Sequence, residues 1–374
     1  MIHGHGGNIY EVASRFDCRP SEILDMSSNI NPLGPPPGLL QHLKENMATI
    51  TCLPEVDAGL TVRRFAEFIG VGSDQLLAGN GTTQFIYAIP RILDPARVLI
   101  VGPTYSDYGD ACRLQGVPYK FVTAQESAEF TPAVDKIEQA LQKADTIFIC
   151  NPNNPTGALI PGAVLRNLCR NYPEKKFIID ESYLDFAPNA ENETMVNSEL
   201  ENVIVLLSVS KIFKIPGLRT GFITGTAAGI EKFRPHLLPW STNSLAQSAI
   251  DYIADRKVMI HAFINETRSY IAGQRQQFCQ AIEKAAHFRI FKAQASFVLL
   301  KLQGELTAND VWQKLAKDQI LIRSCANFHG LSDRFIRISL KTPEANRLLA
   351  SRLLAISREA EKSHDGLTSM RVAC

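Results

Sequence analysis

Short runs of mostly apolar residues recur through the middle of the chain, and amphipathic stretches separate them. Arg97 to Val101, Thr146 to Cys150 and Val203 to Leu207 each have the length of a buried strand. Between Thr61 and Ile69 the apolar positions instead recur every three or four residues, which is typical of a helix. Strands that alternate with helices between about residues 75 and 240 predict an α/β fold with a mostly parallel sheet covered on both faces.

The pattern changes towards the C-terminus, where a smaller α+β unit is predicted. Strands are expected near Ser296 to Lys301, Ile320 to Ser324 and Phe335 to Leu340, followed by a helix from Pro343 to about Glu361. We therefore expect a domain boundary near residue 260.

Length, charge and cysteine usage exclude several classes of function. The 374 residues suffice for two domains, and 39 basic against 38 acidic residues give no net field that would recruit nucleic acid or a membrane surface. No apolar run approaches the roughly 18 residues that a membrane span needs. The eight cysteines include no C-x-x-C pair and no metal-finger spacing. We expect a soluble, cytoplasmic protein that holds no metal and acts on a small molecule.

Reactive and anion-binding side chains follow the apolar run that ends at Leu207. Lys211 comes four residues later with Ser208 and Ser210 before it, and Arg219 follows a Pro-Gly turn. Reactive groups gather on loops at the edge of a sheet. An amine for an aldehyde, with hydroxyls and a guanidinium for a phosphate, is the set of groups that pyridoxal phosphate requires. A solvated lysine loop is the alternative interpretation of this lysine alone.

A glycine-rich turn, Gly79-Asn-Gly-Thr-Thr-Gln84, precedes a predicted helix. Backbone N–H groups at Gly81, Thr82 and Thr83 would point at an anion there, and the helix dipole would add to the attraction. Such a turn is by itself more often a plain helix cap. Its agreement with the phosphate ligands near Lys211 favours a phosphate site.

Two further polar residues lie where predicted strands end. Asn154 belongs to Asn151-Pro-Asn-Asn-Pro-Thr-Gly157, in which two prolines fix the backbone while the amide can bond the O3′ oxygen of the cofactor. Asp180 ends the run that begins at Phe177, and its carboxylate can keep a pyridine nitrogen protonated so that the ring accepts electrons. A generic Asn-Pro turn and a structural aspartate are the alternatives.

The pattern Ser-x-Ser-Lys-x-x-x-Ile-Pro-Gly-Leu-Arg-x-Gly, which starts at Ser208, resembles the lysine segment of fold-type I aminotransferases, especially the histidinol-phosphate aminotransferase branch. The resemblance implies that Lys211 carries the cofactor, that Tyr105 stacks on its ring and that Tyr183 shares the O3′ oxygen. These three residues join Gly81, Thr82, Asn154, Asp180, Ser208, Ser210 and Arg219 as candidate cofactor ligands, with Lys211, Asp180 and Tyr105 as the catalytic candidates.

The same resemblance implies the architecture. We expect a large domain with a mostly parallel seven-stranded sheet in residues 46–260, and a small α+β domain in residues 261–374. Residues 1–45 would form an N-terminal arm and part of that small domain. A homodimer with shared active sites is also implied. Leu53 stands where the family has a tyrosine that reaches the cofactor phosphate of the neighbouring subunit, and leucine cannot make that hydrogen bond.

Three segments are similar to a narrower family, the threonine-phosphate decarboxylases of cobalamin biosynthesis. They are His5-Gly-Gly-Asn8, Asn29-Ile-Asn-Pro-Leu-Gly34 and Ser324-Cys-Ala-Asn-Phe328. This resemblance implies decarboxylation of L-threonine O-3-phosphate to (R)-1-amino-2-propanol O-2-phosphate. Decarboxylation of L-serine O-phosphate and a histidinol-phosphate-type transamination stay open as alternatives, because the orientation of the substrate decides the reaction. A non-catalytic regulator is a third alternative, which the intact set of cofactor ligands disfavours.

The resemblance also supplies candidate substrate ligands. Arg337 matches the aminotransferase arginine for the substrate α-carboxylate, Asn154 lies beside the cofactor, and His5 and Asn31 are placed near the substrate. Arg323 is not otherwise employed, and we expect it to bind the substrate phosphate together with His5 and Asn31. Either arginine could instead be a surface residue with its charge in water.

Overall fold

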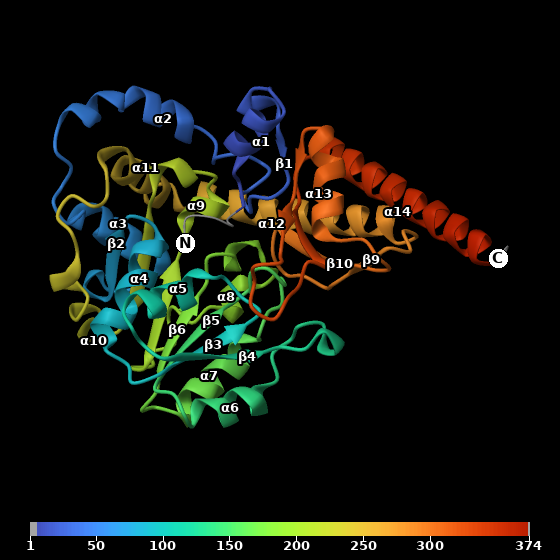
Figure 1. The fold of residues 1–374 in the computed structure, drawn as a ribbon. Helices are drawn as coiled ribbons and strands as arrows, with labels where there is room; N and C mark the ends of the chain where they lie inside the picture. The colour runs from blue at the N-terminus through green and yellow to red at the C-terminus, as the bar shows by residue number, and fades with distance from the viewer. Residues whose placement is uncertain (1–5, 373–374) are drawn as a thin grey trace.

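A computed structural model describes residues 6–372, with side chains through residue 362. Its largest element is a sheet of seven strands in the order β2-β8-β7-β6-β5-β3-β4 (Figure 1). The strands are β2 (Leu76–Gly79), β3 (Val98–Gly102), β4 (Tyr119–Thr123), β5 (Thr146–Cys150), β6 (Lys176–Asp180), β7 (Val203–Leu207) and β8 (Gly221–Gly225). Only β8 runs antiparallel to its neighbours, so the predicted mostly parallel seven-stranded sheet is confirmed.

Six of the seven strands are almost entirely buried because the sheet is covered on both faces, whereas the edge strand β4 is partly exposed. Along β5, Ile147 and Ile149 pack in one hydrophobic cluster with Leu165 and Leu168 of α7 (Gly162–Asn171). Phe148 points to the opposite face and belongs to the main core cluster. A strand buried on both sides loses the alternation of apolar and polar residues that marks a half-exposed sheet.

The other helices are α1 (Ile9–Arg15), α2 (Leu39–Glu45), α3 (Gly59–Ile69), α4 (Thr82–Leu93), α5 (Asp107–Leu114), α6 (Val134–Leu141), α8 (Ala190–Glu193), α9 (Val209–Ile212), α10 (Ala227–Glu231), α11 (Ser244–Ala254), α12 (Lys257–Ile282), α13 (Ala308–Lys317) and α14 (Pro343–Val372). Among the described residues, no helix combines the length and the apolar character needed to cross a membrane.

A smaller antiparallel sheet forms the second lobe, in the order β12-β13-β10-β9. These strands are β12 (Arg323–Ser324), β13 (Phe335–Ser339), β10 (Phe297–Leu302) and β9 (Phe288–Ile290). The N-terminal part of the chain joins this lobe, since β1 (Leu24–Asp25) pairs in parallel with β11 (Ile320–Leu321). In Figure 1 the small lobe, with α13 and α14, lies to the right of the large sheet.

One sequence-based expectation about this lobe needs correction. The single strand predicted from Ile320 to Ser324 is two short strands, β11 and β12, which pair in different sheets. The boundary predicted near residue 260 falls inside α12, which is continuous from Lys257 to Ile282. Helical periodicity continues through this position, so the sequence carries no break there.

Candidate active site

Side chains at the carboxyl ends of the parallel strands converge on one cavity beside Lys211. Its volume is about 210 Å³. It is lined by every residue predicted to hold the cofactor: Gly81, Thr82, Tyr105, Asn154, Asp180, Tyr183, Ser208, Ser210, Lys211 and Arg219. The carboxyl edge of a parallel sheet is where α/β folds place their ligands.

Lys211 lies on α9, the single helical turn that follows β7. Burial lowers the pKa of its amine to about 8, with the charges of Arg219 and Arg337 acting in the same direction and Asp180 opposing them. The pKa of an exposed lysine is about 10.4, so the fold shifts this amine towards its neutral, nucleophilic form.

This shift predicts how apoprotein takes up pyridoxal phosphate. Attachment needs the neutral amine, whose population rises as the pH increases through the pKa of about 8. We expect the rate of covalent attachment to increase about tenfold per pH unit below that value and to level off above it. Stopped-flow absorbance from pH 6 to 10 measures it, and an increase that continues up to pH 10 would contradict the shift.

Asp180 is the last residue of β6 and is buried. Its Oδ1 accepts a hydrogen bond of 2.9 Å from the backbone N–H of Ser182, and its Oδ2 accepts one of 2.7 Å from the hydroxyl of Tyr108. Burial raises the pKa of this carboxyl, whereas both donors lower it. The two hydrogen bonds fix the orientation of the carboxylate.

Sequence reasoning missed Tyr108. It lies on α5 three residues after Tyr105, is fully buried and stacks on Phe148 with ring centroids 5.0 Å apart. An aromatic residue at helical spacing indicates core packing, and nothing in the sequence marks its hydroxyl as the partner of Asp180.

An anion site lies at the other end of the cavity, where α4 begins against Arg219. Gly81 has a φ of 74°, and a Cβ there would lie 2.9 Å from Nη2 of Arg219. A Cβ on Gly221 would lie 2.6 Å from the backbone nitrogen of Thr82. Glycine at both positions therefore lets the helix N-terminus approach the guanidinium and β8 closely. Helix N–H groups and an arginine fork together suit a phosphate.

A second cavity of about 180 Å³ adjoins the first, and the two share Tyr105, Asn154, Tyr183 and Lys211. It is also lined by Arg323 and Arg337. These arginines face each other across neighbouring strands, because Arg323 of β12 is in register with Arg337 of β13. Side chains directly opposite in an antiparallel pair lie on the same face of the sheet.

Hydrogen bonds hold both arginines, but no carboxylate forms an ion pair with either within the described residues. Arg337 is buried and donates from Nη2 to the carbonyl of Ser27 at 2.6 Å and from Nη1 to Oδ1 of Asn154. The oxygen of Asn154 is thereby engaged, so its NH₂ group remains to donate. Arg323 donates to the carbonyl of Ser324 and to Asn327, both at 2.7 Å.

The structure corrects the prediction that Asn31 contacts substrate. Asn31 is fully buried and lines neither cavity. Its amide donates to the carbonyl of Ile212 on α9 at 2.7 Å and to the hydroxyl of Thr267 on α12 at 2.9 Å, so the side chain joins these two helices. His5 lies outside the described residues, although the adjacent Gly6 lines the second cavity.

Leu53 is 76% exposed and touches neither cavity. Within residues 6–362, no group of three or more His, Cys, Asp or Glu side chains is arranged to hold a metal ion.

Residues 21–353 match the family model for aminotransferase class I and II. The chain is 32% identical to threonine-phosphate decarboxylase of Salmonella typhimurium over 353 residues, which cover 93% of this chain and 95% of the relative. It is 30% identical to the adenosylcobalamin biosynthesis bifunctional protein CobDQ of Leptospira interrogans, over 92% of this chain but only 40% of that longer protein.

A solved structure gives the same fold. The histidinol-phosphate aminotransferase from Clostridium acetobutylicum is 27% identical, superposes with a TM-score of 0.82, and matches 90% of this chain and 100% of its own. The cavity beside Lys211 supplies an amine, an anion site and a buried carboxylate in one place, which fits pyridoxal phosphate. The chain belongs to the aminotransferase class I and II family of pyridoxal phosphate-dependent enzymes.

Proposed function

We propose that this enzyme decarboxylates L-threonine O-3-phosphate, giving (R)-1-amino-2-propanol O-2-phosphate and carbon dioxide. The observation that carries the proposal is the cross-strand pair of Arg323 and Arg337 in the cavity that adjoins Lys211. Like charges directly opposite each other destabilise a sheet, and buried charges without a partner are costly. A substrate with two anionic groups, a carboxylate and a phosphate, would offset both costs.

The surroundings of the two arginines suggest which anionic group of the substrate each one binds. Arg337 lies closer to the cofactor residues, because it hydrogen-bonds Asn154, and we assign the α-carboxylate to it. Arg323 is assigned the phosphate; its guanidinium carbon lies 4.9 Å from the ring centroid of Phe328. The Salmonella relative, whose name specifies threonine phosphate, supports this substrate.

The remaining residues have roles that follow from their positions. Gly81, Thr82, Ser208, Ser210 and Arg219 would hold the cofactor phosphate, while Tyr105, Asn154, Asp180 and Tyr183 would hold its ring. Pyridoxal phosphate, when bound, supplies the electron-accepting ring that stabilises the electron pair left at Cα. Lys211 lines both cavities, so its amine can deliver a proton to Cα after carbon dioxide has left.

A panel of substrates tests the proposal. The holoenzyme is incubated with threonine phosphate, with serine phosphate, and with histidinol phosphate plus 2-oxoglutarate, and carbon dioxide and glutamate are measured separately. Carbon dioxide from threonine phosphate without glutamate is expected. Since one methyl group is worth only about 1 to 3 kcal/mol in a binding pocket, serine phosphate should react more slowly, by tenfold or more. Glutamate without carbon dioxide would establish a transaminase instead.

Substitution of the two arginines should affect phosphorylated and unphosphorylated substrates differently. Arg323→Ala should raise KM for threonine phosphate by about 10²-fold, the scale of a lost charge-assisted bidentate contact, and leave the response to threonine nearly unchanged. Arg337→Ala should weaken binding of both compounds, because both carry the α-carboxylate. Steady-state kinetics and the cofactor absorbance of each variant check this. Equal losses on both compounds in Arg323→Ala would make that residue structural.

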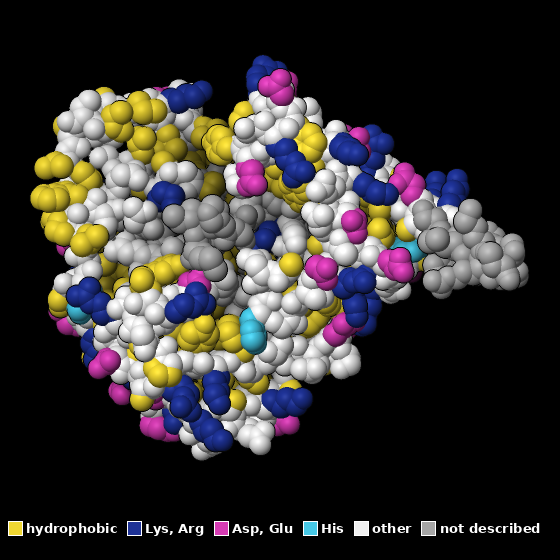
Figure 2. Space-filling view, viewed as in Figure 1, with side chains coloured by type: hydrophobic (Ala, Val, Ile, Leu, Met, Phe, Trp, Pro, Cys, Tyr) yellow, Lys and Arg dark blue, Asp and Glu magenta, His cyan; other side chains and the backbone are white. Residues whose placement is uncertain are grey.

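We further propose that the enzyme is a homodimer. Large apolar side chains are exposed along α2, the segment that follows it, the first turn of α3 and the loop before α11. They are Leu40, Met47, Ile50, Leu53, Val56, Leu60, Leu238 and Trp240. Figure 2 shows hydrophobic side chains over α2 and along the left edge of the molecule. The two stretches are joined, since the N–H of Trp240 donates to the carbonyl of Val56 at 2.8 Å. Exposed apolar area of this extent marks an interaction site.

Charge placed in this surface should therefore separate the subunits. We expect the double variant Leu53→Glu, Trp240→Glu to elute as a monomer, because it buries two unpaired carboxylates in an apolar interface. Light scattering coupled to size exclusion measures the mass. Leu114→Glu is the matched control, since Leu114 is 69% exposed on α5 outside this surface. Wild-type protein with the mass of one chain would refute the dimer.

A further inference from the structure

One segment of the large lobe reaches across to the small lobe. We call residues 124–131, which connect the edge strand β4 to α6, the strap. The strap includes a 3-10 turn, Glu126–Ala128, followed by Glu129 and Phe130 with φ values of 52° and 55°. Two consecutive non-glycine residues in the left-handed region are uncommon, and such backbone persists where the surroundings hold it in place.

Aromatic packing holds the strap on the small lobe. Phe130 is 3% exposed, and its ring centroid lies 5.0 Å from that of Phe291 and 5.8 Å from that of Phe335. These rings form one hydrophobic cluster with Leu299 and Phe328. Except for Phe130 and Ala124, all buried members of this cluster come from the small lobe.

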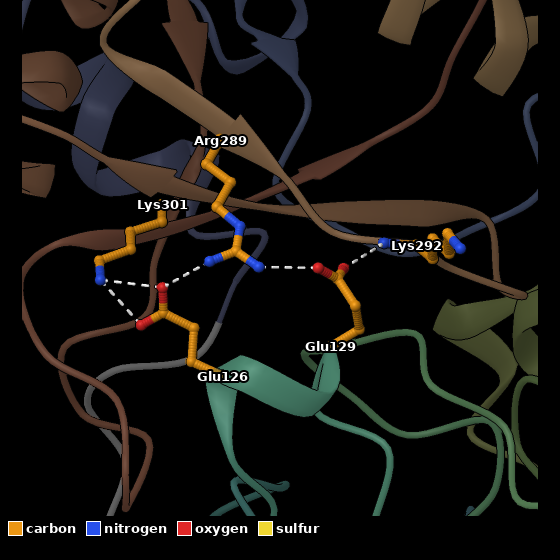
Figure 3. A network of polar contacts seen from close by, with 5 residues as sticks. All are labelled: Glu126, Glu129, Arg289, Lys292 and Lys301. Carbon is orange, nitrogen blue, oxygen red and sulfur yellow. Dashed lines mark hydrogen bonds and ion pairs between the residues drawn. The ribbon is translucent and has the colours of Figure 1, made fainter.

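Ion pairs also join the strap to the small lobe, and Figure 3 shows this network. Glu126 pairs with Arg289 at 3.0 Å and with Lys301 at 2.8 Å, and Glu129 pairs with Arg289 at 2.7 Å. The cations also lie against the rings below, with Arg289 4.8 Å from the centroid of Phe291 and Lys301 5.8 Å from that of Phe335. Both carboxylates belong to the strap and both cations to the small lobe.

The same cluster supports the loop 325–331, which follows Arg323. Cys325 and Phe328 are buried in the cluster, and Phe328 also lines the second cavity beside Arg323. The large lobe holds this loop on its other side, where the ring of His329 stacks on Phe121 with centroids 4.0 Å apart. A Cβ on Gly330 would lie 2.6 Å from Cγ2 of Thr123, which shows how closely the loop approaches β4.

We propose that the strap is a positioning element for the phosphate end of the substrate site. Glu126 and Glu129 anchor the strap on β9 and β10 through Arg289 and Lys301. Phe130 then packs in the cluster that also contains Cys325 and Phe328, so the strap supports loop 325–331 and, through Phe328, the guanidinium of Arg323 that lies against its ring. No residue of the strap lines either cavity. That the positioned group binds a phosphate rests on the proposed function, whereas the support of loop 325–331 by the strap, which we call the clamp, rests on contacts alone.

The test uses the holoenzyme of the double variant Glu126→Gln, Glu129→Gln, which keeps side-chain shape and removes the ion pairs. The variant loses three partly exposed ion pairs, and pairs of this kind contribute little free energy each. Their combined loss corresponds to a change of about threefold to tenfold in the equilibrium between the clamped and the released loop. We expect KM for threonine phosphate to rise by that factor, with kcat and cofactor absorbance unchanged within twofold. Inorganic phosphate should bind the holoenzyme more weakly by the same factor in calorimetric titration.

Hydrogen exchange gives a readout that does not depend on the reaction. In the variant, the amides of Cys325 and Phe328, which bond the carbonyls of Phe335 and Cys325, should exchange about threefold to tenfold faster. Glu344→Gln is the control, because Glu344 pairs with Arg347 on α14 and contacts no part of the strap.

The results of these experiments distinguish a failure of the clamp from a failure of the proposed function. Unchanged exchange in loop 325–331 overturns the clamp whatever the enzyme does. Faster exchange with unaltered phosphate affinity overturns the positioning role. If wild-type enzyme releases no carbon dioxide from threonine phosphate, the proposed function fails, and exchange together with phosphate titration still decides the clamp.

Discussion

Replacing Lys211 with alanine is expected to abolish both covalent cofactor attachment and turnover. The structure places no other lysine against either described cavity, and burial has already lowered the pKa of this amine to about 8. Loss of a group that acts as nucleophile and proton carrier reduces rates by about 10²–10⁴-fold or more. The visible absorbance of bound cofactor and the release of carbon dioxide measure the two losses.

Lys214→Ala is the matched control for this experiment. Lys214 lies three residues further on, and it lines neither cavity. We expect it to retain absorbance and turnover within twofold of wild type. Borohydride reduction followed by peptide mass spectrometry locates the attachment. A reducible adduct that persists in Lys211→Ala would defeat the assignment.

Asp180→Ala is expected to bind the cofactor and to turn over at least about 100-fold more slowly, the scale for removal of one key electrostatic group. The anion site at Gly81 and Arg219 is distant in sequence from Asp180 and would still hold the phosphate. What is lost is the negative charge that Ser182 and Tyr108 orient through hydrogen bonds. Single-turnover kinetics with saturating cofactor separate this loss from weaker binding.

The neighbouring carboxyl provides a control of equal burial. Glu181 accepts hydrogen bonds from the hydroxyl of Thr194 and the N–H of Met195, both at 2.6 Å, away from the cofactor residues. Burial raises its pKa to about 8. Glutamine keeps the side-chain shape, and its amide oxygen can accept from the N–H of Met195 while its NH₂ group donates to the hydroxyl of Thr194. Glu181→Gln should keep turnover within twofold. Near-normal turnover in Asp180→Ala would show that Asp180 is structural.

The elements that sequence predicted best are those whose environment is uniform. Val203–Leu207 and Thr146–Cys150 were predicted to the residue, because a strand buried on both faces is apolar from end to end. The ten predicted cofactor residues also line the first cavity, since their motifs lie near strand ends, at a helix start or around Lys211, whereas Tyr108, which lines the same cavity, was not predicted. In both cases the local sequence pattern determines where the residues lie in the fold.

The features that were not predicted from the sequence depend on contacts between distant segments. The register that sets Arg323 against Arg337 and the hydrogen bond from Tyr108 to Asp180 join residues that no short pattern relates. Asn31 was assigned to the substrate because its segment resembles a family motif, yet its side chain points into the protein. A motif places a segment near a site, whereas packing decides which way each side chain faces.

Asn31 also links two parts of the enzyme mechanically. Its amide ties the end of α9, which carries Lys211, to Thr267 in the middle of α12. Helix α12 starts beside the large lobe and ends at the small one. Sliding α12 past α9 would leave buried amide hydrogens unbonded, at a cost of about 1 to 3 kcal/mol for each. These hydrogen bonds therefore resist any displacement of α12 relative to the segment that carries the reactive amine.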